Sequence, residues 1–458
     1  MNRRSVLSLV ASFSVLSLAA CTPPPPAGDS GVDTGTTDIA TTDAVTDSTT
    51  DAPSPTDSGV ATDVPSDTSA PDSSTTTDAS DAATDATDAM ADGGAGCPLT
   101  RVLVTTTDGT EGAYVTGTVA TRALAYVPPP MGSMVEQDHV VRRAGCRVYD
   151  LWRSFGAGPN EIVELDPANP YMPRRRISIP PVAMVGAPNP YDIVEISPTK
   201  SYLVLYNSPR LFVFNPQTGA MSGSVDLTTF AGSDGIPEAA VIHAANGRAW
   251  VALQQLDRMA GYAPPARSTV VAIDTTTDQL ADLDAAMPGV QASVSLTYGN
   301  PQTASATPDG NFWLVASTGT FGNRMDGGID VIDTRSGRVV ATISAAELGA
   351  DPGSLAVVSA TRAWVVTHPS TDSGAVSRVL PLTIGATTTV GAPLFDRPEP
   401  LSDLQLGPDD NVWALNGSFG ASGAVYVFRQ DGTTLSTFNL PARGDAGATG
   451  TYSLAFAP

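Results

Sequence analysis

The stretch "PDGNFWLVASTGTFGNRMDGGIDVIDTRSGRVVATI", from Pro308 to Ile343, contains three apolar runs separated by turn-forming residues. Each run is short and rich in β-branched and aromatic residues, which is typical of β-strands. Asp, Gly, Ser and Pro in the segments between the runs favour tight turns. A further short run, "ASAT" from Ala304, precedes the stretch. The four runs together predict four antiparallel strands that are consecutive in the chain.

Related units recur along the chain, and a repeat of this length indicates a repeat architecture. In four copies a tryptophan stands at the same place in the second predicted strand, and Leu203 holds that place in an earlier copy. These tryptophans are Trp250, Trp313, Trp364 and Trp413. We interpret their recurrence as packing between neighbouring repeats. The repeat is about 50 residues long, and four antiparallel strands per repeat form the blade of a β-propeller.

The copy number predicts how the ring closes. Six full units are visible, and a fragment remains at each end. The C-terminal segment 451–458, "TYSLAFAP", matches a first strand, and the segment 100–127 supplies second, third and fourth strands. We therefore predict an all-β fold, a seven-bladed β-propeller over residues 97–458 in which the terminal strands share one blade and leave no open edge. A rival interpretation gives the N-terminal segment a complete hairpin of its own and leaves the last strand unpaired.

The pattern of a turn, an aromatic-Val strand and xVIDTxTGxVVxTI, clearest from Pro308 to Ile343, resembles the YVTN-repeat propellers of bacterial surface and periplasmic proteins. The resemblance covers nearly all of residues 100–458, although single repeats diverge strongly. It implies the fold. It implies little about activity, because propellers carry many unrelated functions.

The N-terminus has the plan of a secretory signal, with Arg3 and Arg4 followed by a short apolar run and small residues. Leu18-Ala19-Ala20-Cys21 resembles the lipobox of bacterial lipoproteins. That resemblance implies cleavage after residue 20 and diacylglycerol and N-acyl lipid on Cys21, and we expect no other cofactor. A plain secreted protein is the alternative, and the choice between general secretion and twin-arginine export stays open. We expect an extracytoplasmic protein anchored to the membrane, with the outer membrane favoured because Thr22 is not an Asp retention signal.

Residues 21–96 form a Thr/Asp/Ala/Pro-rich segment with fifteen aspartates and no lysine or arginine. Like charges and few large apolar side chains predict a disordered, extended tether. The aspartates are too widely spaced for a calcium loop, and O-glycosylation stays open. The whole chain has a formal charge of −23, so a nucleic-acid partner is not expected. The complete plan resembles lipoproteins of predatory or social deltaproteobacteria.

Two cysteines remain after Cys21. Cys97 precedes the first blade and Cys146 precedes a second strand of the next blade, so the N-terminal sheets could bring them together. An oxidising compartment favours a disulfide. Two unpaired thiols are the alternative.

Catalytic motifs do not stand out, and no metal site is predicted. The three histidines lie on different predicted blades, and no zincin, haem-attachment or nucleophile-elbow pattern occurs. His243 lies in an innermost strand and could face the channel as a ligand or base, although a structural role is simpler. A non-enzymatic binding or scaffold module for a protein or glycan is therefore favoured. The alternative is a calcium-dependent, lactonase-like hydrolase with channel residues such as Glu195, Asp403 and Asn416.

The longest insertion within a repeat lies between second and third strands, from Gln254 to Thr269. Long loops on rigid scaffolds often carry function. We therefore predict a binding loop here. Its candidate contact residues are Gln254, Asp257, Arg258, Tyr262 and Arg267.

Overall fold

The computed structural model describes most of the chain from Cys97 onward. The described residues are 97–107, 111–130, 135–136, 138–153, 161–180, 187–322, 325–371, 374–385, 387–417, 423–440 and 450–458. The predicted signal peptide, the lipid site at Cys21 and the tether lie outside the described residues.

Seven antiparallel sheets of four or five strands form the blades, here called A to G in ring order. Blade A contains β32 (Gly450–Ala457), β1 (Arg101–Thr107), β2 (Gly112–Thr118) and β3 (Leu124–Val127). Blade B contains β4 (His139–Ala144), β5 (Arg147–Trp152), β6 (Glu161–Glu164) and β7 (Arg175–Ser178). Blade C contains β8 (Pro190–Ser197), β9 (Lys200–Leu205), β10 (Arg210–Phe214) and β11 (Met221–Asp226).

The remaining blades follow the same order. Blade D contains β12 (Ala239–Ala245), β13 (Arg248–Leu253), β14 (Thr269–Asp274), β15 (Gln279–Leu280) and β16 (Ser293–Ser295). Blade E contains β17 (Pro301–Ala306), β18 (Phe312–Ser317), β19 (Gly328–Asp333) and β20 (Arg338–Ser344). Blade F contains β21 (Pro352–Ser359), β22 (Arg362–Thr367), β25 (Ser377–Thr383), β26 (Thr389–Val390) and β27 (Phe395–Arg397), and blade G contains β28 (Leu401–Leu406), β29 (Val412–Asn416), β30 (Ala424–Phe428) and β31 (Thr434–Asn439).

Few elements lie outside the blades. They are a two-stranded ribbon of β23 (Ser370–Thr371) and β24 (Gly374–Ala375), the short helices η1 (Thr228–Phe230) and η2 (Arg258–Ala260), and the helix α1 (Ala345–Leu348). Among the described residues, no helix has the length and apolar character needed to cross a bilayer.

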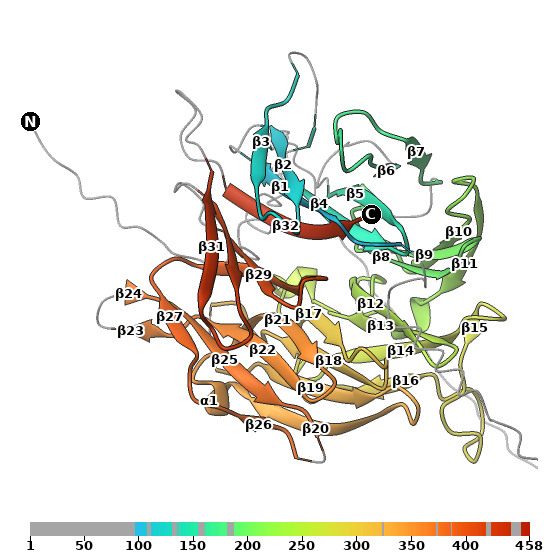
Figure 1. Cartoon of the computed structure of the whole chain (residues 1–458). Helices are drawn as coiled ribbons and strands as arrows, with labels where there is room; N and C mark the ends of the chain where they lie inside the picture. The colour runs from blue at the N-terminus through green and yellow to red at the C-terminus, as the bar shows by residue number, and fades with distance from the viewer. Residues whose placement is uncertain are drawn as a thin grey trace, which may run out of the picture. The chain divides into compact units, whose positions relative to one another are not determined.

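The two ends of the propeller meet in blade A, which confirms the prediction of a shared blade. The C-terminal β32 pairs antiparallel with β1, with Val104 opposite Leu454 (Figure 1). The innermost strands of the seven blades contact one another in cyclic order, and β32 contacts both β28 and β4. The ring therefore closes through hydrogen bonds between the first and last described strands.

Blades D and F depart from the simple four-strand pattern. Their third strands each pair with two short outer strands, β15 and β16 in blade D and β26 and β27 in blade F. A divided outer strand disturbs little, because the outer edge of a blade is largely exposed.

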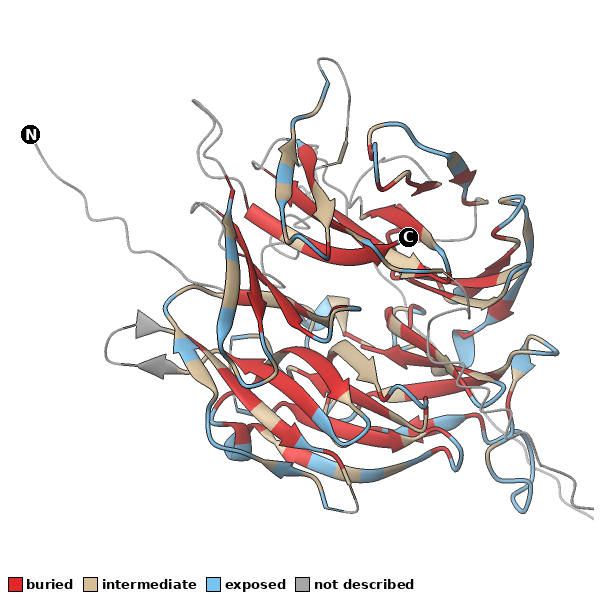
Figure 2. Cartoon of the chain, viewed as in Figure 1, coloured by how far each residue is buried: buried red, intermediate tan, exposed pale blue. Residues whose placement is uncertain are grey.

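The core lies between neighbouring blades, as the buried middle strands in Figure 2 illustrate. The four recurrent tryptophans occupy the second strands β13, β18, β22 and β29, and each is at most 2% exposed. Trp364 packs in one cluster with blade G residues, and Trp413 packs with residues of blade A. The predicted role of the tryptophans in packing between blades is therefore confirmed.

Candidate functional site

The predicted loop between β13 and β14 folds back onto blades C and D. Asp257 is the N-cap of η2, and its carboxylate accepts hydrogen bonds from the N–H groups of Met259 and Ala260. Gly261 is the C-cap of the helix, and its φ of 69° suits a residue without a β-carbon. This local capping gives the loop a defined conformation and leaves Met259 at its tip, 89% exposed.

Arg258 connects this loop to its base. Its Nε lies 3.0 Å from the Oε1 of Glu238 and 3.3 Å from the Oδ2 of Asp234, and a terminal nitrogen donates to the Oδ1 of Asn207 at 3.0 Å. Glu238 is fully buried and also accepts from the N–H of Leu256. Burial and the nearby Asp234 carboxylate raise the pKa of Glu238 to about 8, against the opposing effect of Arg258.

The other predicted loop residues have different surroundings. The Gln254 side chain is buried and accepts from the Tyr206 hydroxyl at 2.8 Å while donating to the Pro301 carbonyl. Tyr262 adopts a left-handed backbone conformation, with φ of 64°. The charge of Arg267 lowers the pKa of Asp330 in blade E, although burial raises that pKa overall. The structure therefore gathers Gln254 and Arg258 at the base of the loop, while Asp257 caps its helix.

Aromatic and arginine side chains continue from this base toward blade B. Tyr191 stacks on Tyr206 with a ring separation of 4.9 Å, and the Arg153 guanidinium lies 5.2 Å from the Tyr191 ring. Arg153 also pairs with Asp138 at 2.7 Å. We call Arg153, Tyr191, Tyr206 and Arg258 the Arg–Tyr row. Sequence reasoning missed its first three members, because no local motif marks side chains that meet across three blades.

The channel side of the ring carries a second charged group. Arg142 of β4 lies 3.4 Å from the Asp192 carboxylate of β8, and its charge also acts on Asp403 of β28. The two carboxylates accept hydrogen bonds from the N–H groups of Ile242 and Leu454 on the next innermost strands. Burial raises the pKa of both carboxyl groups, and Arg142 opposes the rise. These aspartates therefore join neighbouring blades.

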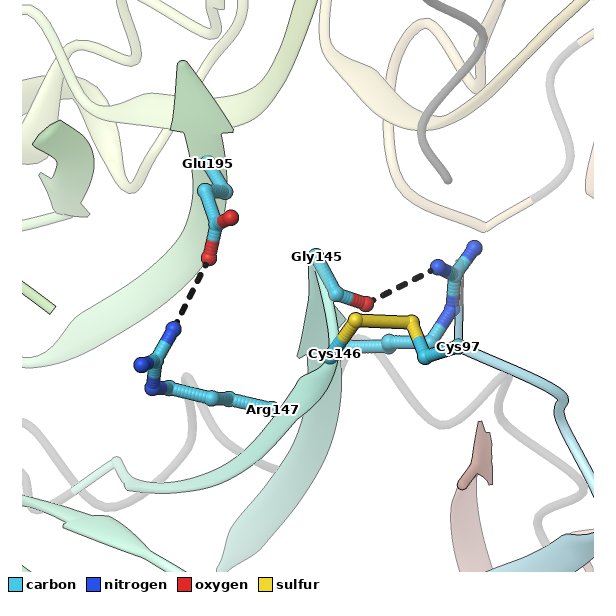
Figure 3. Close-up of a disulfide and its surroundings, with 6 residues drawn as sticks. Cys97, Gly145, Cys146, Arg147 and Glu195 are labelled. Carbon is cyan, nitrogen blue, oxygen red and sulfur yellow. Dashed lines mark hydrogen bonds and ion pairs between the residues drawn. A yellow bond between two sulfur atoms is a disulfide. The ribbon is translucent and has the colours of Figure 1, made fainter. Parts of the chain in front are cut away.

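The residues considered for a calcium-dependent hydrolase do not converge. Glu195 lies near the turn between β8 and β9 and pairs with Arg147 at 3.3 Å (Figure 3). Asn416 ends β29 at the opposite end of its blade, opposite Leu401 at the start of β28. In the part of the chain that the structure describes, no group of three or more His, Cys, Asp or Glu residues could hold a metal ion.

The three histidines lie in separate environments. His243 is 7% exposed and stacks on Trp313 of blade E at 6.1 Å, and burial lowers its pKa to about 4. His368 follows β22, and burial also lowers its pKa to about 4. His139 is fully buried and lies 3.0 Å from Asp150. Each position agrees with a structural role, and His243 packs between blades rather than toward the channel.

The two propeller cysteines are joined. Cys97 and Cys146 form a disulfide with a Cα–Cα distance of 5.8 Å (Figure 3). Cys146 lies in the turn between β4 and β5, so the bond attaches the segment before blade A to blade B.

Comparisons with known proteins identify the fold alone. No family model matches the chain, and no curated protein matches it significantly. A solved protein from Lactobacillus plantarum is 13% identical, with a TM-score of 0.52 over 77% of this chain and 99% of that one. A protein of unknown function from Desulfotomaculum acetoxidans is 14% identical, with a TM-score of 0.50 over 78% of this chain and 99% of that one. At this identity, the likeness supports the propeller and says nothing about its ligand.

Proposed function

We propose that this chain is a non-enzymatic binding module. Its protein partner docks on the surface formed by the Arg–Tyr row and the loop between β13 and β14. The single observation that carries the proposal is the exposed Met259 side chain at the tip of a fixed loop. Met259 is 89% exposed, and the neighbouring Arg258 holds the base of the loop through its contacts with Glu238 and Asn207. The backbone of a preorganised loop loses little conformational freedom on binding, and an exposed apolar side chain offers surface that a partner can bury. Tyr and Arg are also enriched where proteins bind one another.

Photo-crosslinking in producing cells tests the docking site. A crosslinking amino acid replaces Met259 in one full-length variant and Met287 in another. Met287 is a matched control because it is also an exposed methionine of the blade D region, at 54%. We expect one discrete crosslinked partner at position 259 and none at position 287, and Arg258→Gln should reduce the yield. Equal crosslinking at both positions would contradict the assignment.

The proposal includes a lipid anchor at Cys21 that holds the module outside the cytoplasm. The support is the lipobox-like sequence Leu18-Ala19-Ala20-Cys21 behind a short apolar run. Two or more acyl chains give stable anchoring, since each buried methylene contributes about 0.8 kcal/mol. The wild-type protein should incorporate labelled palmitate and should sediment with membranes. The Cys21→Ser variant should lose both the label and the membrane association. Retained label in that variant would overturn the anchor without affecting the docking proposal.

A further inference from the structure

A small cavity lies between blades A and B, and no residue of the Arg–Tyr row lines it. Its volume is about 130 Å³. Besides three aliphatic side chains, its walls contain Tyr114, Trp152, Pro170, Tyr171, Pro173 and Arg176. These residues come from β2, from the end of β5 and from the β6–β7 region (Figure 1). Three of the nine lining residues are therefore aromatic, and five others are aliphatic or proline.

The polar atoms of the three aromatic walls are already bonded within the protein. The Tyr114 hydroxyl donates to Asp150 at 2.5 Å, and the Trp152 Nε1 donates to the same carboxylate at 2.8 Å. The Tyr171 hydroxyl donates to the Val127 carbonyl at 3.3 Å. The aromatic lining consequently offers mainly apolar ring surface to an occupant.

A buried network fixes the positions of these rings. Asp150 is fully buried and accepts from Tyr114 and Trp152, and its carboxylate lies 3.0 Å from the Nδ1 of His139. Tyr114 meets Tyr171 edge to face at a ring separation of 5.1 Å. Because each ring is held by a hydrogen bond or a ring contact, the cavity is preformed and binding requires little reorganisation.

Arg176 is the cationic residue in the lining. Its guanidinium lies 5.3 Å from the Trp152 ring, and its side chain is 49% exposed. One terminal nitrogen of Arg176 donates a hydrogen bond to the carboxylate of Glu161. A guanidinium has five N–H donors, so Arg176 retains capacity for a second carboxylate.

We propose that this cavity binds one small aromatic carboxylate, with its ring among Tyr114, Trp152 and Tyr171 and its carboxylate at Arg176. The volume sets the size, because an apolar cavity of about 150 Å³ holds benzene. The half-exposed guanidinium of Arg176 favours a negatively charged group on the ring of the ligand, because guanidinium groups pair with carboxylates. This site goes beyond the proposed docking function, since it lies at the interface of blades A and B and shares no residue with the Arg–Tyr row.

Isothermal titration calorimetry of the full-length protein with benzoate tests the proposal. We expect saturable binding of one benzoate per chain at millimolar or lower concentration. Benzamide keeps the ring and lacks the charge, and cyclohexanecarboxylate keeps the charge and lacks the aromatic ring. Both should bind at least five-fold more weakly, about 1 kcal/mol at 25 °C. Absence of saturable benzoate binding to the wild-type protein would overturn the proposal.

Two variants locate the site. Arg176→Gln should weaken benzoate binding about ten-fold, whereas Arg174→Gln should change it less than two-fold. Arg174 is a matched control because it is 53% exposed, pairs with Asp166 and is absent from the lining. Val163→Phe should abolish binding by filling the cavity, with near-UV circular dichroism to check the fold. Equal affinities for the Arg176 and Arg174 variants would contradict the proposal.

Discussion

Blade A and the loop above blade D are held in place by different kinds of contact. In blade A the terminal strands bury a continuous apolar cluster that includes Val102, Val104, Leu454 and Phe456. The loop of blade D is held at its base by the polar and charged contacts of Arg258 and Gln254. Apolar burial acts without direction and without regard to pH, whereas a buried carboxylate depends on its protonation. Ring closure and loop position should therefore respond to different perturbations.

The largest expected effect tests ring closure. Phe456 is 4% exposed and lies edge to face on Trp413 at 5.7 Å. Phe456→Ala should lower the free energy of unfolding by about 3–5 kcal/mol, because it removes a buried ring and leaves a cavity. Urea denaturation measures the loss, with Val340→Ala as the control, since Val340 is 47% exposed. A loss like that of the control would show that the last strand is not part of the cooperative unit.

The disulfide should stabilise the attachment of the segment before blade A to blade B. Cys97 and Cys146 are separated by 49 residues. Cys97→Ser should lower the free energy of unfolding by about 2–4 kcal/mol, mainly because the unfolded chain gains freedom. Denaturation under non-reducing conditions measures this change, and Cys146→Ser should give the same value. If reduction of the wild-type protein leaves the urea midpoint unchanged, the bond does not stabilise the native state.

Blade D should lose stability in acid through His243. Its pKa is about 4 in the folded protein because of burial, and an unfolded histidine has a pKa of about 6.5. The unfolded state therefore binds the proton first, and stability is lost as the pH falls from about 6.5 to 4. His243→Phe should reduce this loss by about 2 kcal/mol. Parallel stability curves for the variant and the wild type between pH 7 and 4 would contradict this assignment.

The second pH-dependent effect has the opposite sign. The pKa of Glu238 is about 8 in the folded protein, above about 4.3 for an unfolded glutamate. The folded state binds the proton more tightly, so stability falls as the pH rises from about 4.3 toward 8. Glu238→Gln should flatten this decline, because the amide does not titrate. Unfolding free energies at pH 5 and pH 8 provide the measurement, and an equal decline in both proteins would exclude Glu238 as the cause.

Much of the fold was predictable because its signals are local. Alternation of apolar residues, turn chemistry and the recurrent tryptophans each lie within one repeat, and they predicted the second strands that contain Trp250 and Trp313. The shared blade was predictable because one strand was missing at the start and one was left over at the end. The divided outer strands of blades D and F were not predicted, because each is only 2 or 3 residues long and carries little alternation.

The candidate site was only partly predictable. The length of the loop after Leu253 marked it as an insertion, and Arg258 was among its candidate residues. Its partners Glu238 and Asn207 lie 20 and 51 residues earlier. They meet Arg258 because blades C and D are adjacent, and no sequence pattern records that contact.

The repeated local pattern was enough to predict the second strands, the number of blades and the way the ring closes. Only the folded chain shows which polar side chains meet, including Arg258 with Glu238 and Tyr114 with Asp150. Such contacts depend on how blades pack, because the twist and spacing of adjacent sheets set the distances between side chains. A strand's own sequence specifies which face each residue occupies, and the neighbouring blade decides what that face contacts.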